Sequence, residues 1–548
     1  MTLQRSGPRA CHGLMFAAVL ISGAGGCMVG PNYKEPAVRL EQEWMDPGHP
    51  GVQRGPAELT NWWKAFNDPI LNDLVDRAYR NSPTLQAAAV RVLQAQAARG
   101  IAVGLLFPQR QEVTGGFSWN QSSENSGGPH PRQSQIGSTL AWIKDPQGNL
   151  IQRAIGDPGV DPSYENWNVS GLSVGWELDV WGRFRRGIEA TDAVVLASLA
   201  NYDDVLVSLV AEVATNYVFL RTLEEQLVIV QQNLKIQTDS LGIVQLRREG
   251  GTATELDVAQ AQALLHDTEA LIPAIEASIR QTQVALCVSL GMPPQDIQEL
   301  VGQSRPIPAP PEAALVGVPA ELLRRRPDIR RAERQLAAQS ALIGIAVSDF
   351  YPSFSLVGDI GLSAEHFGDL WRGSSLQAFA GPSFRWNILN YGRIENNVRV
   401  QDAAFQALIS DYDALILRAQ GEVEISMASL VGAKRRFVPL TGSTEAAARA
   451  VNIATQQYKG GTADYIRVLT AQQSLITAQS RLISVRGAAA QSMITLYRAL
   501  GGGWELRHGN DLVSPEIKQQ MQERTNWGGM IDSDRVQPKP AATTQPVS

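Results

Sequence analysis

Cysteine and histidine are both scarce in this chain of 548 residues. Its three cysteines, Cys11, Cys27 and Cys287, cannot supply a disulfide framework, so the stability of the fold must come from packing. The six histidines are scattered, with no pair at helical spacing and no cluster with cysteine. This arrangement argues against a dedicated metal site.

Long hydrophobic runs and an excess of positive charge are also missing. No segment beyond the N-terminus has the roughly 18 uninterrupted apolar residues of a membrane-spanning helix, so a chain that crosses a membrane must do so as a β-barrel. The formal net charge of −6 gives no support to nucleic-acid binding. A hydrophobic content of 44% is nevertheless sufficient for large buried cores.

The N-terminus has the organisation of an export signal. Arg5 and Arg9 precede an apolar stretch from residue 14 to 21, and four small residues then lead to Cys27. This resembles a bacterial lipoprotein signal, which predicts removal of residues 1–26 and lipid modification of Cys27. Ala24 stands where such signals usually carry Leu, so an ordinary cleaved signal peptide with an incidental cysteine is the alternative. Met28, in place of Asp, favours the outer over the inner membrane.

The chain contains a long internal repeat. GGTATELDVAQAQALL begins at Gly250 and GGTADYIRVLTAQQSL begins at Gly460, which is 210 positions later. Upstream of Pro108 the offset between the copies is 244, which indicates a 34-residue loop insertion between Pro108 and Trp176. The predicted organisation is an N-terminal anchor over 27–66, a first repeat over 67–300, a Pro-rich linker over 301–320, a second repeat over 321–504 and a flexible tail over 505–548.

Four segments alternate apolar and polar residues with period two, a pattern that predicts strands. They form two hairpins, over about 110–181 and about 352–390, with Pro382 expected at a bulge or irregular position. Strands of about ten residues can cross a bilayer at a tilt, and these carry Trp and Phe on the apolar face. A soluble sandwich would alternate in the same way. Four strands cannot close a barrel of at least about eight, so a membrane barrel requires two or more chains.

Each hairpin is followed by a pair of long helices, over about 183–291 and about 393–500. Apolar residues recur every three or four positions, and this average of 3.5 is typical of coiled coils. The apolar stripe of the first returning helix reappears 210 positions later. Pro273 and Pro439 lie inside these segments and are predicted to kink or interrupt them.

The GGTA stretches are predicted to be the tight reversals between the helices of each pair. Glycines can end one helix and turn the chain, because they adopt positive φ without strain. Polar residues then cap the following helix. The candidate turn residues are Gly250, Gly251, Gly460 and Gly461, and the candidate caps are Thr252 or Thr254 and Thr462 or Asp464.

Several longer motifs, taken together, are similar to one protein family. They are CMVGPNYKEP, WWKAFNDPILNDLVDRAYRNSP, VGWELDVWGR, LLRRRPDIRRAERQLAAQSALIGIAVSDFYPSFSL, YKGGTADYIRVLTAQQSLITAQ and YRALGGGW. The chain resembles outer-membrane efflux factors of the TolC and OprM type, within the NodT-like lipoprotein branch. The resemblance extends from Cys27 to Trp504, nearly the whole mature chain.

The resemblance implies an α+β membrane protein that assembles as a trimer. Twelve strands, four per chain, would close one β-barrel in the outer membrane, and the helices would form a coiled-coil tunnel through the periplasm. Such proteins are passive conduits that join a periplasmic adaptor (membrane fusion) protein and a proton-driven inner-membrane pump, and they export drugs or other toxic compounds. The implied partners include outer-membrane lipid but no nucleic acid, and no cofactor other than the lipid on Cys27.

The resemblance also implies two kinds of site near the helix reversals. The resting gate of the family lies at the inner end of the tunnel, and adaptor hairpins dock in the adjoining grooves. Thr470 stands where relatives often carry an acidic residue, which is a departure at the gate itself. The gate candidates are Asp464, Tyr465, Ile466, Arg467, Thr470 and Asp257, and the docking candidates are Gly251, Thr252, Gly461 and Thr462. An alternative role for all of them is capping and packing at a turn.

Other chemistry has weaker support. GLSVG satisfies the GxSxG pattern of hydrolases, but Ser173 lies within an alternating segment rather than at a strand-to-helix turn. The basic run at 324–326 heads a helix and is expected to be solvated or ion-paired. The alternative function is a structural outer-membrane lipoprotein that binds partners without conducting solute. The sequence does not identify the exported compound, because a wide channel leaves that choice to the pump.

Overall fold

The computed structural model describes residues 28–37, 44–45, 52–54, 58–121, 140–144, 150–154, 163–316 and 324–532. The predicted signal peptide over 1–26, Cys27 and the tail beyond residue 532 lie outside the described residues. The chain divides into two compact units. One contains the N-terminal residues up to Pro31, Gly100–Ile188 and Leu342–Arg399, and the other contains Asn32–Arg99, Glu189–Ala341 and Val400–Ser548. Each unit therefore combines segments from both repeats.

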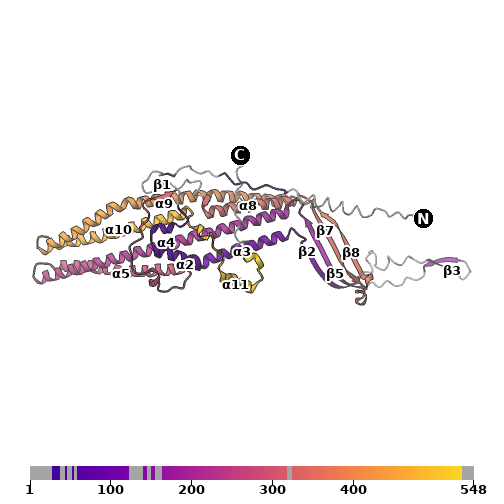
Figure 1. Ribbon diagram of the computed structural model, residues 1–548, viewed down its shortest axis with the longest axis horizontal. Coiled ribbons are helices and arrows are strands. Elements are labelled where there is room, and N and C mark those ends of the chain that lie inside the picture. Colours follow the sequence, from indigo (N-terminus) through magenta and orange to yellow (C-terminus); the bar gives the residue numbers. More distant parts are fainter. Residues whose placement is uncertain are drawn as a thin grey trace. The chain divides into compact units, whose positions relative to one another are not determined.

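The first unit contains a four-stranded antiparallel sheet with the order β2-β5-β7-β8 (Figure 1). Its strands are β2 (Arg110–Gln121), β5 (Ser163–Leu178), β7 (Ser353–Ala364) and β8 (Leu376–Arg385). The pairs β2/β5 and β7/β8 are the two predicted hairpins, which are thereby confirmed. The β5/β7 pairing, from Trp167↔Ala364 to Leu178↔Phe354, joins the hairpins of the two repeats into one sheet.

Two details of the second hairpin differ from the prediction. Pro382 pairs with Leu356 in an unbroken register, so the bulge expected there is absent. Because β8 is an edge strand of this sheet, proline there can direct its missing N–H away from the ladder. The register shifts occur instead at Glu112/Thr114 and Ser170/Leu172. The second hairpin, predicted to run to about residue 390, ends at Arg385.

The insertion in the first hairpin carries structure of its own. Two short strands, β3 (Leu140–Lys144) and β4 (Leu150–Ala154), pair antiparallel with Ile143 opposite Ile151. The sequence predicted only a loop there, because the Gly- and Pro-rich surroundings obscure two five-residue strands. The insertion is therefore a second, smaller hairpin between β2 and β5.

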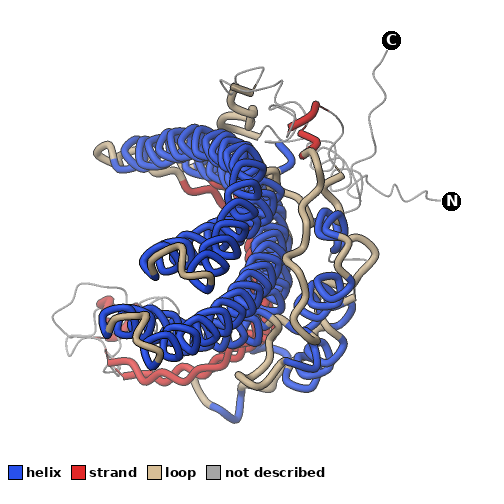
Figure 2. The backbone as a smooth tube through the Cα atoms, turned by 90° about the vertical axis from the view of Figure 1, so that its left-hand side faces the viewer, coloured by secondary structure: helices blue, strands red, loops and turns tan. Residues whose placement is uncertain are grey.

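The long helices repeat with identical lengths. α4 (Arg183–Glu249) and α9 (Arg393–Lys459) each have 67 residues, and α5 (Glu255–Ser289) and α10 (Tyr465–Ala499) each have 35. At 1.5 Å per residue, each 67-residue helix is about 100 Å long. Figure 2 shows the helices in blue and, in tan, the two short loops that join α4 to α5 and α9 to α10. The predicted helix pairs are confirmed.

The prolines inside these helices do not interrupt them. Pro273 lies within α5 and Pro439 within α9, and both helices continue through these positions. Both prolines are on exposed faces, so the carbonyl that loses its donor lies at the surface rather than in the core. The sequence predicted that the prolines kink or interrupt these helices, and of the two the interruption is wrong.

Shorter helices complete the helical framework. α2 (Pro69–Asn81) and α3 (Pro83–Gly104) precede β2, and α8 (Pro327–Ser348) precedes β7. α6 (Gln298–Val301) follows α5, and β1 (Val52–Arg54) pairs in parallel with β6 (Ala314–Val316) of the predicted linker. Three short 3₁₀ turns, η1 (Trp62–Phe66), η2 (Phe367–Asp369) and η3 (Gly373–Ser375), lie among them.

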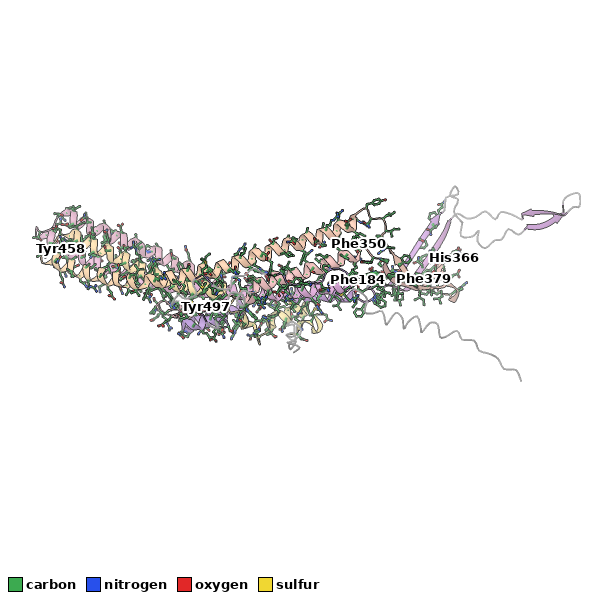
Figure 3. All side chains as sticks on the ribbon, turned by 90° about the horizontal axis from the view of Figure 1, so that it is seen from above. Phe184, Phe350, His366, Phe379, Tyr458 and Tyr497 are labelled. Carbon is green, nitrogen blue, oxygen red and sulfur yellow. The ribbon has the colours of Figure 1, made fainter. Side chains whose placement is uncertain are left out.

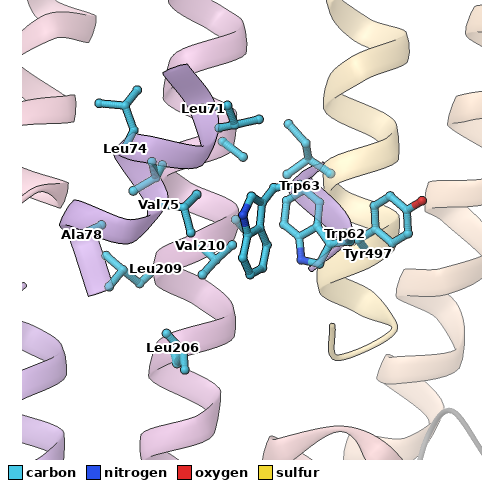
Figure 4. Close-up of a cluster of buried hydrophobic side chains, with 14 of the residues drawn as sticks. Trp62, Trp63, Leu71, Leu74, Val75, Ala78, Leu206, Leu209, Val210 and Tyr497 are labelled. Atoms are coloured by element: carbon cyan, nitrogen blue, oxygen red, sulfur yellow. The ribbon is translucent and has the colours of Figure 1, made fainter. Parts of the chain in front are cut away.

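The main core of the second unit forms around the tryptophans of the WWKAF stretch (Figure 4). Trp62 and Trp63 are almost completely buried, and the Trp62 ring stacks on Tyr497 of α10 with 5.2 Å between centroids. Leu71 and Leu74 of α2 pack into the same core with residues of α4. Burying each large apolar side chain contributes about 1.5–3 kcal/mol, which makes this segment a principal tie between the repeats.

The C-terminal region is folded as far as residue 532, which corrects the prediction of a flexible tail from 505. It forms η4 (Trp504–Arg507), α11 (Pro515–Arg524) and η5 (Gly528–Ile531). Arg507 pairs with the fully buried Asp203 of α4, with 2.7 Å between Nε and Oδ1. The sequence pattern missed this region because its contacts come from isolated residues. The buried apolar ones are Leu512, Val513, Met521 and Ile531.

One part of α4 is apolar enough, by average hydropathy, to resemble a membrane span. Its best 18-residue window has a mean hydropathy of 1.6, and 61% of that window is buried inside the protein. The core helix of a folded domain has the same composition. We attribute the hydropathy of α4 to its place in the core of the second unit.

Candidate functional site: the tips of the two helical hairpins

Both helical hairpins reverse through the same backbone motif. We call residues 250–254 the first tip and 460–464 the second tip. Gly251 and Gly461 have φ of +71° and +75°, and the next residue, Thr252 or Thr462, donates its N–H to the carbonyl five residues back. These are Schellman endings, in which glycine avoids the cost of a left-handed backbone. The predicted turn role of the glycines is confirmed.

The two tips differ at the start of the returning helix. Thr254 caps α5 by accepting a hydrogen bond from the Asp257 N–H at 3.2 Å, and the Asp257 carboxylate accepts from the Thr254 N–H at 2.9 Å. This reciprocal pair is a capping box. Asp464 occupies the same position before α10 but makes no side-chain capping bond. The hydroxyls of Thr252 and Thr462 bond back to the preceding helix instead.

A cluster of aromatic and charged side chains connects the first helical hairpin to the second. The Arg247 guanidinium lies 4.6 Å from the centroid of the Tyr458 ring and donates to the Tyr458 carbonyl. The Tyr458 ring meets Tyr465 edge-on, with 5.3 Å between centroids. Both tyrosines are buried in a small core built from all four long helices. Figure 3 shows Tyr458 at the end of these helices, far from Tyr497.

Electrostatics favour the neutral form of both tyrosines. Burial raises the pKa of Tyr458 and the Asp257 carboxylate raises it further, while the Arg247 cation lowers it by a smaller amount. Burial also raises the pKa of Tyr465, with a second upward contribution from Asp257 and a hydrogen bond to Ser240 that lowers it. Asp257 is therefore electrostatically coupled to both rings as well as capping α5. Neutral phenols suit a contact that is held by packing and by the Arg247 cation.

The predicted gate residues fall into two groups. Tyr465 and Asp257 belong to the cluster, whereas Asp464, Ile466, Arg467 and Thr470 lie on exposed positions of α10 or its cap. The Thr470 hydroxyl donates to the Ile466 carbonyl at 2.8 Å. The docking candidates Gly251, Thr252, Gly461 and Thr462 are all exposed at the tips. Cys27, the predicted lipidation site, lies outside the described residues.

Arg247 and Tyr458 were not identified from the sequence. At the repeat offset of 210, Tyr458 corresponds to Arg248, and Tyr465 corresponds to Glu255. Both tyrosines thus stand where the first copy carries a charged residue. A search for the positions at which the two copies differ in chemistry would have found the cluster.

The other candidate chemistries are not supported by the geometry. Ser173 pairs with Glu112 and Asp359 in the middle of β5, far from the strand-to-helix turn that a hydrolase nucleophile needs. Among the described residues no group of histidine, cysteine and acidic side chains could hold a metal ion. Arg326 is buried between Asp328 and Glu422, and Arg325 pairs with Glu505, so the basic run is ion-paired as expected.

The sheet of the first unit presents two strands without a second neighbour among the described strands. β2 pairs only with β5, and β8 pairs only with β7. Backbone N–H and C=O groups along such edges favour pairing with another strand. Large apolar side chains are exposed along both edges, among them Val113, Phe117, Trp119, Leu376, Phe379 and Phe384.

Comparison with known proteins gives consistent matches. Residues 74–292 and 318–502 match the family described as outer membrane efflux protein. The pyoverdine export outer membrane protein OpmQ of Pseudomonas putida is 30% identical over 462 residues, covering 84% of this chain and 92% of that protein. The toluene efflux pump outer membrane protein TtgF of Pseudomonas putida is 29% identical over 505 residues, covering 89% and 97%.

The fold has counterparts among solved structures. The outer-membrane channel OprN superposes with a TM-score of 0.75 at 29% identity, covering 87% of this chain and 100% of that chain. The residues of the family match, 74–292 and 318–502, include the sheet, the long helices and their tips.

Proposed function

Because this chain belongs to the outer membrane efflux protein family and serves as the outer-membrane component of an efflux system, we propose that three copies form one conduit. The observation that supports this proposal is the four-stranded sheet, whose edge strands β2 and β8 have no second neighbour among the described strands. Four strands cannot close on themselves, since membrane barrels have at least about eight. Pairing β8 of one copy with β2 of the next would close twelve strands in three copies.

Strand length and surface chemistry support a membrane location for this sheet. The four strands have 12, 16, 12 and 10 residues, and about 9–11 residues suffice to cross a bilayer at a tilt. Phe379 and Phe384 on β8 and Phe117 on β2 are more than half exposed in the single chain. Hydrocarbon or a neighbouring copy would cover these side chains.

The conduit is passive and connects partners that supply energy and selectivity. The long helices form its periplasmic tunnel, where a periplasmic adaptor and a proton-driven inner-membrane pump deliver the solute. Relatives of nearly equal identity are named for the export of pyoverdine and of toluene. Overall sequence identity therefore does not identify the exported compound. We propose only its class, drugs or other toxic compounds. Lipid on Cys27 anchors the assembly in the outer membrane.

The tips provide the gate and the docking surface of this conduit. Arg247, Tyr458 and Tyr465 hold the two helical hairpins of one chain together in the resting state. Asp464, Ile466, Arg467 and Thr470 are exposed on α10 or its cap, so they would line the tunnel rather than hold the two hairpins together. The exposed Gly251, Thr252, Gly461 and Thr462 leave room for an adaptor hairpin to approach the backbone closely.

Electron microscopy and conductance together test the proposal. We expect detergent-purified protein to give particles with threefold symmetry, and the same protein in a planar lipid bilayer to form discrete channels. Compact monomers would contradict the shared barrel. Trimers that never conduct would favour the alternative function, a structural lipoprotein that binds partners without passing solute.

A further inference from the structure

The segment that joins the two repeats is fastened to a long helix of each. We call residues 301–312 the strap. The fully buried Arg221 of α4 donates to carbonyls in its first part, among them that of Gln303 at 3.3 Å. In its last part, Lys434 Nζ of α9 donates to the Pro311 carbonyl at 3.0 Å and also to the next carbonyl. The strap therefore connects α4 of the first repeat to α9 of the second.

A third contact holds the middle of the strap. The Glu225 carboxylate of α4 accepts a hydrogen bond from the Ile307 N–H at 3.4 Å and forms an ion pair with Arg486 of α10. Ile307 and the following Pro308 are buried. The path of the strap over the second repeat is thus set by bonds to helices on either side, although most of it has no regular secondary structure.

A cavity of about 470 Å³ lies between the strap and helices α9 and α10. Small-molecule sites typically have volumes of about 300–1,000 Å³ and mainly apolar walls. Val485 of α10 is 2% exposed, whereas the Phe437 ring of α9 is 43% exposed. Proline and phenylalanine rings give flat walls that suit a planar apolar body. The apolar lining includes Pro308, Pro310, Pro311, Phe437, Val485 and Ala489.

Lys434 brings a positive charge to the lining of this cavity. The other charged residues there are Arg486, which is paired with Glu225, and the exposed Glu312. Lys434 Nζ bonds to two carbonyls, and no carboxylate of the described residues lies within ion-pair distance of it. Burial lowers the pKa of the Lys434 ammonium, and the Glu312 carboxylate raises it by a smaller amount. An ammonium has three N–H donors, so one remains for a ligand.

The first repeat handles the equivalent position differently. At the offset of 210, Lys434 corresponds to Glu224, which pairs with Arg221 at 2.7 Å. The cation that bonds the first part of the strap is therefore neutralised by its own helix. The cation that bonds the last part has carbonyl dipoles as its only bonded partners within the described chain. A partly buried ammonium in that setting favours an anion from outside the chain.

We propose that the cavity is a binding site for an aromatic carboxylate, whose ring system lies between the strap and α10 and whose carboxylate bonds to Lys434. The ring system leaves water for walls of proline, phenylalanine and small aliphatic side chains. The carboxylate forms a charged hydrogen bond in a partly buried place, where such bonds are strongest. The Glu312 carboxylate opposes the ligand only weakly, because its exposed charge is screened by water and salt.

The site is independent of the proposed conduit. All of its residues belong to the second compact unit of a single chain. Binding can therefore be measured whether or not the protein assembles into a channel or conducts. A ligand seated there would add contacts between the strap and α10, and so would strengthen the connection between the repeats without entering the tunnel.

Calorimetric titration of the full-length protein in lipid nanodiscs tests the site, with empty nanodiscs as the blank. The probes are 2-naphthoate and the neutral 2-naphthamide, which share a ring system and differ in charge. We expect saturable binding of both, with 2-naphthoate about tenfold tighter because only its head group forms a charged bond with the ammonium. Absence of saturable 2-naphthoate binding would overturn the site. Equal affinities for the two probes would overturn the assigned carboxylate.

A variant of Lys434 separates ligand binding from the structural role of the same side chain. Lys434→Met should weaken 2-naphthoate about tenfold and leave 2-naphthamide unchanged. Equal weakening of both probes would mean that Lys434 only positions the strap, and the carboxylate contact would be wrong. Arg436→Met is the matched control, because Arg436 is exposed on the same helix and is not part of the cavity lining. It should bind both probes as wild type does.

A variant that fills the cavity tests its location. Ala489 lines the cavity, and Ala489→Leu places a larger side chain there. We expect this variant to lose binding of both probes at least tenfold, since the ring system no longer fits. Ala488→Leu adds the same side chain at the adjacent exposed position and should bind normally. Wild-type affinity in Ala489→Leu would show that the probes bind elsewhere and would overturn the proposal.

Discussion

The two helical tips share a chain reversal and differ in what holds the helix that follows. Both end the long helix with the same Schellman motif, using Gly251 in one copy and Gly461 in the other. The first tip then closes a capping box between Thr254 and Asp257. The second has no side-chain cap and instead places Tyr465 in the interhelical core.

The two copies of the repeat therefore share a backbone conformation at the tips, whereas their side chains have different roles. At the repeat offset, Thr254 and Asp257 correspond to Asp464 and Arg467, and an arginine cannot return the capping bond that an aspartate makes. The first tip is therefore stabilised by local bonds. The second is stabilised by tertiary contacts, including the Arg247 cation supplied by the first hairpin. A tip held by contacts between elements can be released without unfolding its own turn.

The largest expected effect comes from removing the Tyr465 ring. Tyr465 is 2% exposed, and truncating a large buried aromatic to alanine costs about 3–5 kcal/mol. We expect Tyr465→Ala to loosen the second tip, raise resting conductance in a planar bilayer and speed amide exchange at the start of α10. The capping box should keep exchange at the start of α5 unchanged.

Arg467→Ala is the matched control on the same helix. Arg467 was first grouped with Tyr465 as a gate residue, but its side chain is exposed and outside the tyrosine cluster. We expect the Arg467→Ala channel to keep its resting conductance. Equal opening by both variants would place the gate on the exposed face of α10 and remove the proposed role of the buried ring.

A smaller effect is expected from Arg247, which links the first helical hairpin to Tyr458 of the second. Arg247→Met removes a cation–π contact and a charged hydrogen bond, together worth about 2–3 kcal/mol when partly buried. Arg248→Met serves as control, because its ion pair with Glu255 is exposed and such pairs contribute about 0–1 kcal/mol. Conductance and amide exchange of both variants measure the difference.

A double-mutant cycle isolates the ring contact from the rest of the Arg247 effect. Tyr458→Leu removes the ring and keeps the carbonyl that Arg247 also bonds. We expect a coupling energy of about 1 kcal/mol between Arg247→Met and Tyr458→Leu. A coupling near zero would mean that only the carbonyl bond links the hairpins through Arg247.

The regular spacing of apolar residues made the long helices and the strands predictable from the sequence. The apolar stripe of α4 and the copy of the α5 stripe in α10 run over dozens of residues, so their helices could be located from the sequence. The hairpins β2/β5 and β7/β8 were equally clear from alternation. The bulge predicted at Pro382 was wrong because the effect of a proline depends on whether its strand is at an edge. That is a property of the sheet and not of the strand.

Contacts between distant segments were not predictable in this way. Arg247 and Tyr458 are 211 positions apart, and their contact depends on how two helical hairpins pack. The pairing of Arg507 with Asp203 spans 304 positions and fixes a segment that has no periodic pattern. Of the proposed site residues, the sequence located the tips correctly through the GGTA repeats but did not separate buried from exposed positions on α10.

The smallest expected effect tests whether the missing cap itself matters. Asp464→Thr combined with Arg467→Asp transfers the capping box of the first tip to the second and should stabilise the start of α10 by about 1 kcal/mol. Thr254→Ala should destabilise the start of α5 by a similar amount, and amide exchange at each helix start measures both. A gain at α10 without a change in resting conductance would show that capping governs only the turn, while Tyr465 and Arg247 govern the gate. No gain would mean that the Asp464 carboxylate already stabilises the helix through its charge near the N-terminus, so that the two tips differ only in their tyrosines.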